Sequence, residues 1–343
     1  MTNTITFKPK QVTKRILSGL SPRAYEVVVN RFGVTDDAQR KTLEAIGKKY
    51  GITRERVRQI ENTALSLICK SESFKNEKDV FLELKKIIET LGAIIGEHDL
   101  LNHLSKDKLT QNHINLFLTL GSDFTKHKED DHFKTRWSID SDIAEQIHKS
   151  LKNLFENLSE DELISEGELV ARFLDDVKDL SEQYKNEEIV KRWLSMSNKI
   201  SKNPLGEWGK STSSSIKTRG VKDYAFLMMR KHGSPMHFKE VAKAVASTFN
   251  KKCHIATCHN ELIKDPRFVL VGRGIYALSE WGYKTGVVRD VIKELIKKNG
   301  PMTKEEIVDQ VMKERYLKKD TILVNLQNSK YFKKNKNGQY IVA

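Results

Sequence analysis

Four side chains that could read DNA bases lie close together in this sequence. Arg54 and Arg58 carry guanidinium groups, Glu55 carries a carboxylate and Gln59 carries an amide. Arginine can donate two hydrogen bonds to guanine, and glutamate can accept one from the cytosine amino group. If this stretch is helical, all four side chains lie on the polar face of its first two turns. The pattern predicts recognition of base edges in a major groove.

The elements that would position these side chains lie within residues 42–68, TLEAIGKKYGITRERVRQIENTALSLI. The segment contains two apolar stretches with helical spacing, and Gly51 interrupts the pattern between them. Thr53 is a favourable N-cap for the second stretch, and Glu55 in its first turn suits the helix dipole. Two helices joined by a short turn that contains glycine form a helix-turn-helix. The alternative is that the charged face is only a solvated helix surface.

Together with RFGV at residues 31–34, this stretch resembles region 4 of the bacterial primary sigma factors. The run TRERVRQIE is the most specific part of the resemblance. The resemblance implies that the four side chains named above read bases of the promoter −35 element. It further implies that three other residues lie near DNA phosphates: Arg31, Thr53 and Arg56.

The net charge of +14 is unevenly distributed along the 343 residues. Residues 1–70 contain 14 Lys and Arg against 6 Asp and Glu, residues 71–210 contain 20 against 28, and residues 211–343 contain 26 against 12. Acidic groups near phosphate oppose DNA binding. We therefore expect two basic, DNA-competent ends and an acidic centre that packs, spaces or binds protein, with an accidental asymmetry as the alternative.

Three helical stretches followed by a hairpin recur at residues 221–284 and 285–343, which is the outline of a winged helix. Gly272-Arg273-Gly274 and Asn337-Gly338 mark the two hairpin turns. The first of these units resembles the HARE-HTH module, a winged helix shared by the delta subunit of bacterial RNA polymerase, chromatin-associated proteins and some restriction enzymes. The resemblance rests on Pro235, His237, Phe238, Val241, residues 259–262, Asp265, Phe268 and residues 272–278.

The expected fold is mainly α with small β wings: a helix-turn-helix followed by tandem winged-helix domains. We interpret the two acidic segments as degenerate winged helices, with a plain helical bundle as the alternative. The expected domains are a basic arm at 1–20, the helix-turn-helix at 21–70, acidic units at 75–140 and 141–209, a Ser/Thr-rich linker at 210–220, the HARE-HTH at 221–284 and a basic winged helix at 285–343.

The sequence shows no signature of an enzyme. It contains no phosphate-binding G-x4-G-K-[ST] loop, no G-x-G-x-x-G after a strand and no nucleophile elbow around its serines. Cys253-His254 and Cys258-His259 lack the second ligand pair that a zinc site needs. We therefore expect no catalysis, no cofactor, no metal and no small-molecule substrate.

The sequence has no apolar run of 18 residues and no N-terminal leader, and its three cysteines suit a reducing compartment. This predicts a soluble, cytoplasmic and nucleoid-associated protein without a membrane partner. Only some twenty residues precede the helix-turn-helix, which leaves no room upstream for the strand-melting region of a sigma factor. We expect the chain not to be a complete sigma factor.

The sequence thus predicts a double-stranded DNA-binding transcription regulator that reads a −35-like element. The RNA polymerase core is a further expected partner, by family analogy alone. One alternative is a polymerase-binding adaptor with little DNA specificity, and another is a sequence-blind chromosomal DNA binder. The basic C-terminal units are expected to hold flanking duplex through phosphate contacts from Lys251, Lys252, Arg273, Lys333, Lys334 and Lys336.

Overall fold

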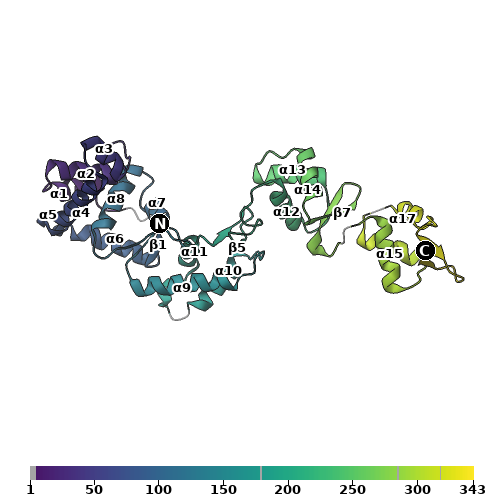
Figure 1. Cartoon of the computed structure of the whole chain (residues 1–343). Helices are drawn as coiled ribbons and strands as arrows, with labels where there is room; N and C mark the ends of the chain where they lie inside the picture. The colour runs from purple at the N-terminus through teal and green to yellow at the C-terminus, as the bar shows by residue number, and fades with distance from the viewer. Residues whose placement is uncertain (1–4, 178–179, 284–285, 317) are drawn as a thin grey trace. The chain divides into compact units, whose positions relative to one another are not determined.

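The computed structural model describes residues 5–177, 180–283, 286–316 and 318–343. These residues form a mainly helical protein with small antiparallel sheets (Figure 1). The chain divides into two compact units. The first comprises residues 1–202 with 206–212, and the second comprises 203–205 with 213–343.

The first unit begins with the helix-turn-helix. Gly51 ends its first helix in the left-handed conformation, at φ +65°, where glycine has no steric penalty. A Cβ atom at Gly47 would lie 2.6 Å from the carbonyl oxygen of Ile52, so this position also requires glycine. Val27, Ile46 and Val57 form a small core beneath the motif. The helices are α1 (Pro9–Leu17), α2 (Pro22–Phe32), α3 (Leu43–Tyr50), α4 (Arg54–Lys70) and α5 (Glu72–Lys75).

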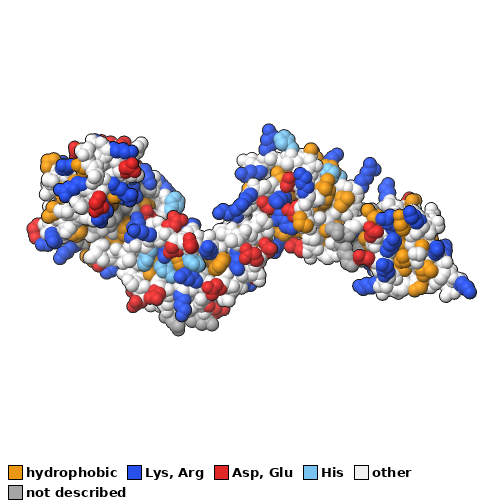
Figure 2. Space-filling view, viewed as in Figure 1, with side chains coloured by type: hydrophobic (Ala, Val, Ile, Leu, Met, Phe, Trp, Pro, Cys, Tyr) orange, Lys and Arg blue, Asp and Glu red, His pale blue; other side chains and the backbone are white. Residues whose placement is uncertain are grey.

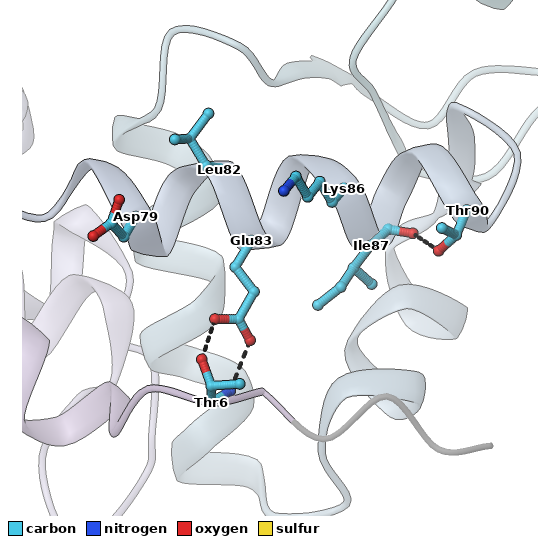
Figure 3. Close-up of a pocket in the computed structure, with 7 residues that line it drawn as sticks. All are labelled: Thr6, Asp79, Leu82, Glu83, Lys86, Ile87 and Thr90. Carbon is cyan, nitrogen blue, oxygen red and sulfur yellow. Dashed lines mark hydrogen bonds between the residues drawn. The ribbon is translucent and has the colours of Figure 1, made fainter.

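The prediction of a basic arm over residues 1–20 is wrong for residues 9–17, which form α1. Val12 and Ile16 lie four residues apart on one face of this helix and are buried. The preceding segment is also attached, because Thr6 donates hydrogen bonds to the Glu83 carboxylate through both its backbone N–H and its hydroxyl (Figure 3). The apolar face of α1 is only two turns long, and its contacts come from helices far along the chain.

A winged helix follows immediately. Its sheet has the order β1-β3-β2, in which Ile95 pairs with Trp137. Its elements are α6 (Lys78–Thr90), β1 (Ile94–Gly96), α7 (Glu97–Leu104), α8 (Lys108–Leu120), β2 (Thr125–His127) and β3 (Arg136–Ser138). Its core is continuous with α1, α2 and α4, so this winged helix and the helix-turn-helix share one hydrophobic interior.

The second acidic segment has the same plan in reduced form. Ile164 pairs with Trp208 as an isolated bridge, in the place of the first sheet strand. Phe173 and Trp193 are fully buried at its centre. The elements are α9 (Ser141–Asn157), α10 (Glu166–Asp176), the 3-10 turn η1 (Glu182–Tyr184), α11 (Glu187–Ser195), β4 (Ile200–Lys202) and β5 (Trp208–Lys210). Both acidic segments are therefore winged helices rather than plain bundles.

The second unit contains the two basic winged helices. The first of them has the strand order β6-β8-β7, which is the same topology as β1-β3-β2. Its elements are α12 (Val221–His232), β6 (Met236–His237), α13 (Phe238–Phe249), α14 (Ile255–Lys264), β7 (Phe268–Gly272), β8 (Ile275–Leu278) and the 3-10 turn η2 (Ser279–Trp281). The last winged helix consists of α15 (Val288–Asn299), α16 (Lys304–Glu314), α17 (Lys319–Leu326), β9 (Phe332–Lys334) and β10 (Tyr340–Val342).

These elements confirm the predicted fold class. In the part of the chain that the structure describes, no helix is both long enough and apolar enough to span a bilayer.

Candidate nucleic-acid interface

The first two turns of α4 expose all four of the predicted base-reading side chains: Arg54, Glu55, Arg58 and Gln59. The opposite face of the helix is anchored, because Val57 is fully buried and Ile60 packs against the same core. The helix is thus held from behind while its polar face remains open to a ligand.

Glu55 and Arg58 form a two-point ion pair on this open face. Arg58 Nε lies 2.8 Å from Glu55 Oε2, and Nη2 lies 2.6 Å from Oε1. The hydrogen bond from Arg58 lowers the pKa of Glu55, and the hydrogen bond to Glu55 raises the pKa of Arg58. Both groups therefore remain ionised near neutral pH, and the carboxylate orients the guanidinium that the sequence assigns to base recognition.

The other two predicted residues at this end of α4 support the same surface. The Thr53 hydroxyl accepts a hydrogen bond from the Arg56 backbone N–H at 3.2 Å, as expected of an N-cap. The Arg56 guanidinium donates to the Gln59 side-chain oxygen at 3.1 Å. The structure therefore brings Thr53 and Arg56 together with the base-reading residues.

Arg31 lies apart, near the end of α2. Its Nε atom is 3.4 Å from the Glu61 carboxylate on α4, and its Nη1 atom donates to the Lys41 carbonyl at 3.3 Å. Burial raises the pKa of Glu61, and the attraction of Arg31 opposes that rise. Arg31 thus ties α2 to α4 internally, a contact that the sequence reading did not foresee alongside a phosphate role.

Comparison with known proteins identifies two modules. Residues 16–68 match the family described as Sigma-70, region 4. The N-terminal module is a sigma region 4 domain. Residues 219–281 match the HARE-HTH family, an HTH domain whose description includes ASXL and restriction endonuclease. Both predicted resemblances are confirmed, and region 4 domains are DNA-binding helix-turn-helix modules, which supports a DNA-binding role related to transcription.

Several sigma factors share the region 4 domain with this chain. RNA polymerase sigma factor SigA of Clostridium acetobutylicum is 43% identical over 70 residues, which are 20% of this chain and 18% of that protein. RpoD of Helicobacter pylori is 46% identical over 56 residues, 16% of this chain and 8% of that protein. SigA1 of Synechococcus elongatus is 54% identical over 50 residues, 15% and 12%. The chain spans less than a fifth of the length of each of these relatives.

The region 4 domain is supported by a residue that the sequence reading missed. Asn112 on α8 is fully buried and donates through Nδ2 to the carbonyls of Gly33 at 2.8 Å and Ala38 at 2.9 Å. Its side-chain oxygen accepts from Arg40 Nε at 2.8 Å. Asn112 therefore fixes the link between α2 and α3. No local pattern reveals this role; the only hint is a polar trio, residues 111–113, inside an otherwise apolar helix.

The predicted phosphate contacts of the second unit lie on two different winged helices. Lys251 and Lys252 are exposed in the loop before α14, and Arg273 is exposed at the β7–β8 turn of the HARE-HTH domain. The other three are exposed on the β9–β10 wing: Lys333, Lys334 and Lys336. They form two separate basic surfaces rather than one site.

The cysteines of the HARE-HTH domain have a packing role. Cys258 is fully buried in α14, and burial raises the pKa of its thiol to about 12. It therefore stays protonated, whereas metal binding requires a thiolate. Among the described residues, no group of three or more His, Cys, Asp and Glu side chains is arranged to hold a metal ion.

Proposed function

We propose that the chain is a sequence-specific double-stranded DNA-binding transcription regulator that reads a −35-like promoter element through α4. One observation carries this proposal: the Glu55–Arg58 ion pair is exposed at the start of a helix whose other face is buried. A pre-oriented guanidinium at this end of a recognition helix is suited to a two-point hydrogen bond with guanine.

Phosphate contacts would position this reader on the duplex without adding sequence information. Arg56 and Thr53 lie beside the base-reading side chains and are suited to this role. The basic winged helices would add further contacts, and each phosphate that they neutralise makes binding more sensitive to salt.

RNA polymerase is the protein partner that the comparisons favour, because the relatives that share region 4 are named as RNA polymerase sigma factors. The acidic winged helices, which have more carboxylates than cations, are the part of the chain least suited to DNA and most available to a protein. The protein would thus join a promoter element to the polymerase.

Fluorescence anisotropy on two short duplexes tests the proposal. One duplex carries a consensus −35 hexamer and the other a scrambled version. We expect Arg58→Ala to weaken binding by about 1–3 kcal/mol on the consensus duplex alone. Lys70→Ala, an exposed cation at the far end of the same helix, is the matched control and should leave the preference unchanged.

Equal binding of both duplexes by wild type and Arg58→Ala would contradict the proposal. A polymerase pull-down would then separate the two alternatives. Capture of the core enzyme would favour an adaptor, and failure to capture it, with strong salt-sensitive DNA binding, would favour a sequence-blind binder.

A further inference from the structure

Three cations surround one aromatic ring in the last winged helix. The Arg289 guanidinium lies 4.3 Å from the centroid of the Tyr331 ring, Lys293 Nζ lies at 4.7 Å and Lys330 Nζ at 5.9 Å. Cations are attracted to the face of an aromatic ring, so Tyr331 holds these positive groups together on a small surface. We call this surface, formed by residues 289, 293, 330 and 331, the Tyr331 cluster.

The cluster is built on regular elements. Arg289 and Lys293 are four residues apart on α15 and therefore lie on one face of the helix, and exposed Lys297 continues the same stripe. Tyr331 leads into β9, and its backbone is fixed by hydrogen bonds with Asn328 and Ala343. Lys333, two residues further along, points to the same side of the wing.

The cluster carries a surplus of positive charge. Asp290 lies 3.5 Å from Arg289 and is the one acidic side chain paired with it among the described residues. Over the same residues, no carboxylate lies within ion-pair distance of Lys293 or Lys330. Cations held this close repel one another, and an anion placed between them removes that repulsion. Figure 2 shows Lys and Arg side chains around α15 in this part of the molecule.

The third helix of the same domain, α17, is poorly suited to DNA. It begins with Lys319 and Asp320, whose charges oppose each other, and Val324 is 66% exposed on its surface. An exposed valine makes at most an apolar contact with a thymine methyl group. The helix that usually enters the major groove in helix-turn-helix proteins therefore offers little here.

We propose that the last winged helix binds the sugar-phosphate backbone of duplex DNA through the Tyr331 cluster and Lys297, and not through α17. The stripe from residue 289 to 297 is about 12 Å long at about 1.5 Å per residue. One DNA strand presents a phosphate about every 3.4 Å of helix axis, so the stripe faces about three phosphates. The assignment rests on the proposed function only in taking DNA as the ligand.

The basic composition of this part of the chain favours DNA over an acidic protein. Residues 211–343 contain 26 Lys and Arg against 12 Asp and Glu, and the cluster offers cations around a half-buried ring rather than an apolar pocket for an anchoring side chain. The contact is independent of base sequence, because phosphate contacts position a protein without specifying bases.

The test compares two triple variants of the full chain that remove the same charge from the same domain. One is Arg289→Gln, Lys293→Gln and Lys330→Gln. The matched control is Lys304→Gln, Lys313→Gln and Lys319→Gln, which removes exposed cations from α16 and α17. Binding to the scrambled duplex is measured by anisotropy at several salt concentrations, and thermal melting checks that each variant is folded.

The cluster variant should bind roughly tenfold more weakly, and its slope of log K against log salt should fall by about 2–3, at about 0.9 per lost phosphate contact. The control should lose less than one unit of slope. Equal losses in both variants would overturn the proposal, as would wild-type binding by the cluster variant. Stronger displacement of the duplex from wild type than from the cluster variant by polyglutamate supports the cluster as the anion site, whereas preferential binding of polyglutamate over duplex overturns the choice of DNA.

If the triple cluster variant does not fold, the double variant Lys293→Gln and Lys330→Gln replaces it, with an expected loss of slope of about 2. The result is separable from the −35 proposal. An absent Arg58→Ala effect on the consensus duplex rejects base reading by α4, whereas the cluster variants report on binding to any sequence.

Discussion

Two third helices of the same fold have opposite surroundings in this protein. In the first winged helix, nine residues of α8 are buried, including the polar Gln111, Asn112 and His113. In the HARE-HTH domain only Cys258 and Leu262 of α14 are buried. The two domains have the same element order and the same strand order. The topology alone therefore does not decide whether a third helix is a free surface or part of a core.

The difference follows from what each helix packs against. α8 contributes to a core that includes residues of α1, α2 and α4, so its outer face supports the region 4 domain and is not available to DNA. The outer face of α14 remains open within its own unit. One winged helix thus acts as a scaffold for the reader, and the other retains a surface for a partner.

The largest test of this comparison removes a core side chain from α8. Phe117 is fully buried and contacts Phe7 and Phe81, with ring centroids at 6.0 and 6.4 Å. We expect Phe117→Ala to lower the free energy of unfolding by about 3–5 kcal/mol, because it leaves a cavity. Urea unfolding followed by tryptophan fluorescence measures the loss. The control on α14 is Ile263→Ala, a side chain that is 61% exposed, for which about 0.5 kcal/mol or less is expected.

A second test uses pH. His113 on α8 is buried, and its Nδ1 atom lies 2.7 Å from the Thr13 hydroxyl of α1. Burial, and to a lesser extent Lys10, lowers its pKa to about 4. The folded state therefore favours the neutral imidazole. Its contribution is complete above about pH 6.5, falls as the unfolded chain binds the proton, and is lost below about pH 4.

The full contribution of this group is about 3 kcal/mol, of which about 2 kcal/mol should be lost between pH 7.5 and pH 5. His113→Asn should remove that part of the pH dependence. His148, whose pKa burial also lowers to about 4, would retain its own part. An unchanged pH profile of the unfolding free energy in the variant would show that α8 does not bury a neutral histidine.

A third test compares two asparagines on the two helices. We expect Asn112→Ala to cost about 1–3 kcal/mol, because the carbonyls of Gly33 and Ala38 lose their buried donor. The variant should also bind the consensus duplex less tightly, because the link before α3 loses its support. Urea unfolding and anisotropy measure the two effects. Wild-type stability would show that α8 does not organise the region 4 domain.

The smallest effect is expected on α14. Asn260 is exposed, and Asn260→Ala should change the unfolding free energy by about 0.5 kcal/mol or less. Thermal melting beside Asn112→Ala measures the contrast directly. A loss comparable to that of Asn112→Ala would mean that α14 is also covered in the folded protein, and the comparison would fail.

The local features of the fold could be predicted from the sequence because neighbouring residues decide them. Thr53 caps α4 and Gly51 ends α3, as their side chains and backbone preferences indicate. The same holds for the hairpin turns at Gly274 and Gly338, both of which have positive φ. The exposed Glu55–Arg58 pair likewise follows from helical spacing. These are short-range consequences of residue type and position.

Only the tertiary structure decided which surfaces are free. The pairing of Arg31 with Glu61 and the hydrogen bonds from Asn112 to residues 33 and 38 join positions that are far apart in the chain. The burial of α1, expected to be an arm, depends on the same packing against α8. An apolar or charged face has the same sequence pattern whether another element covers it or not, because burial is a property of the neighbour as much as of the helix.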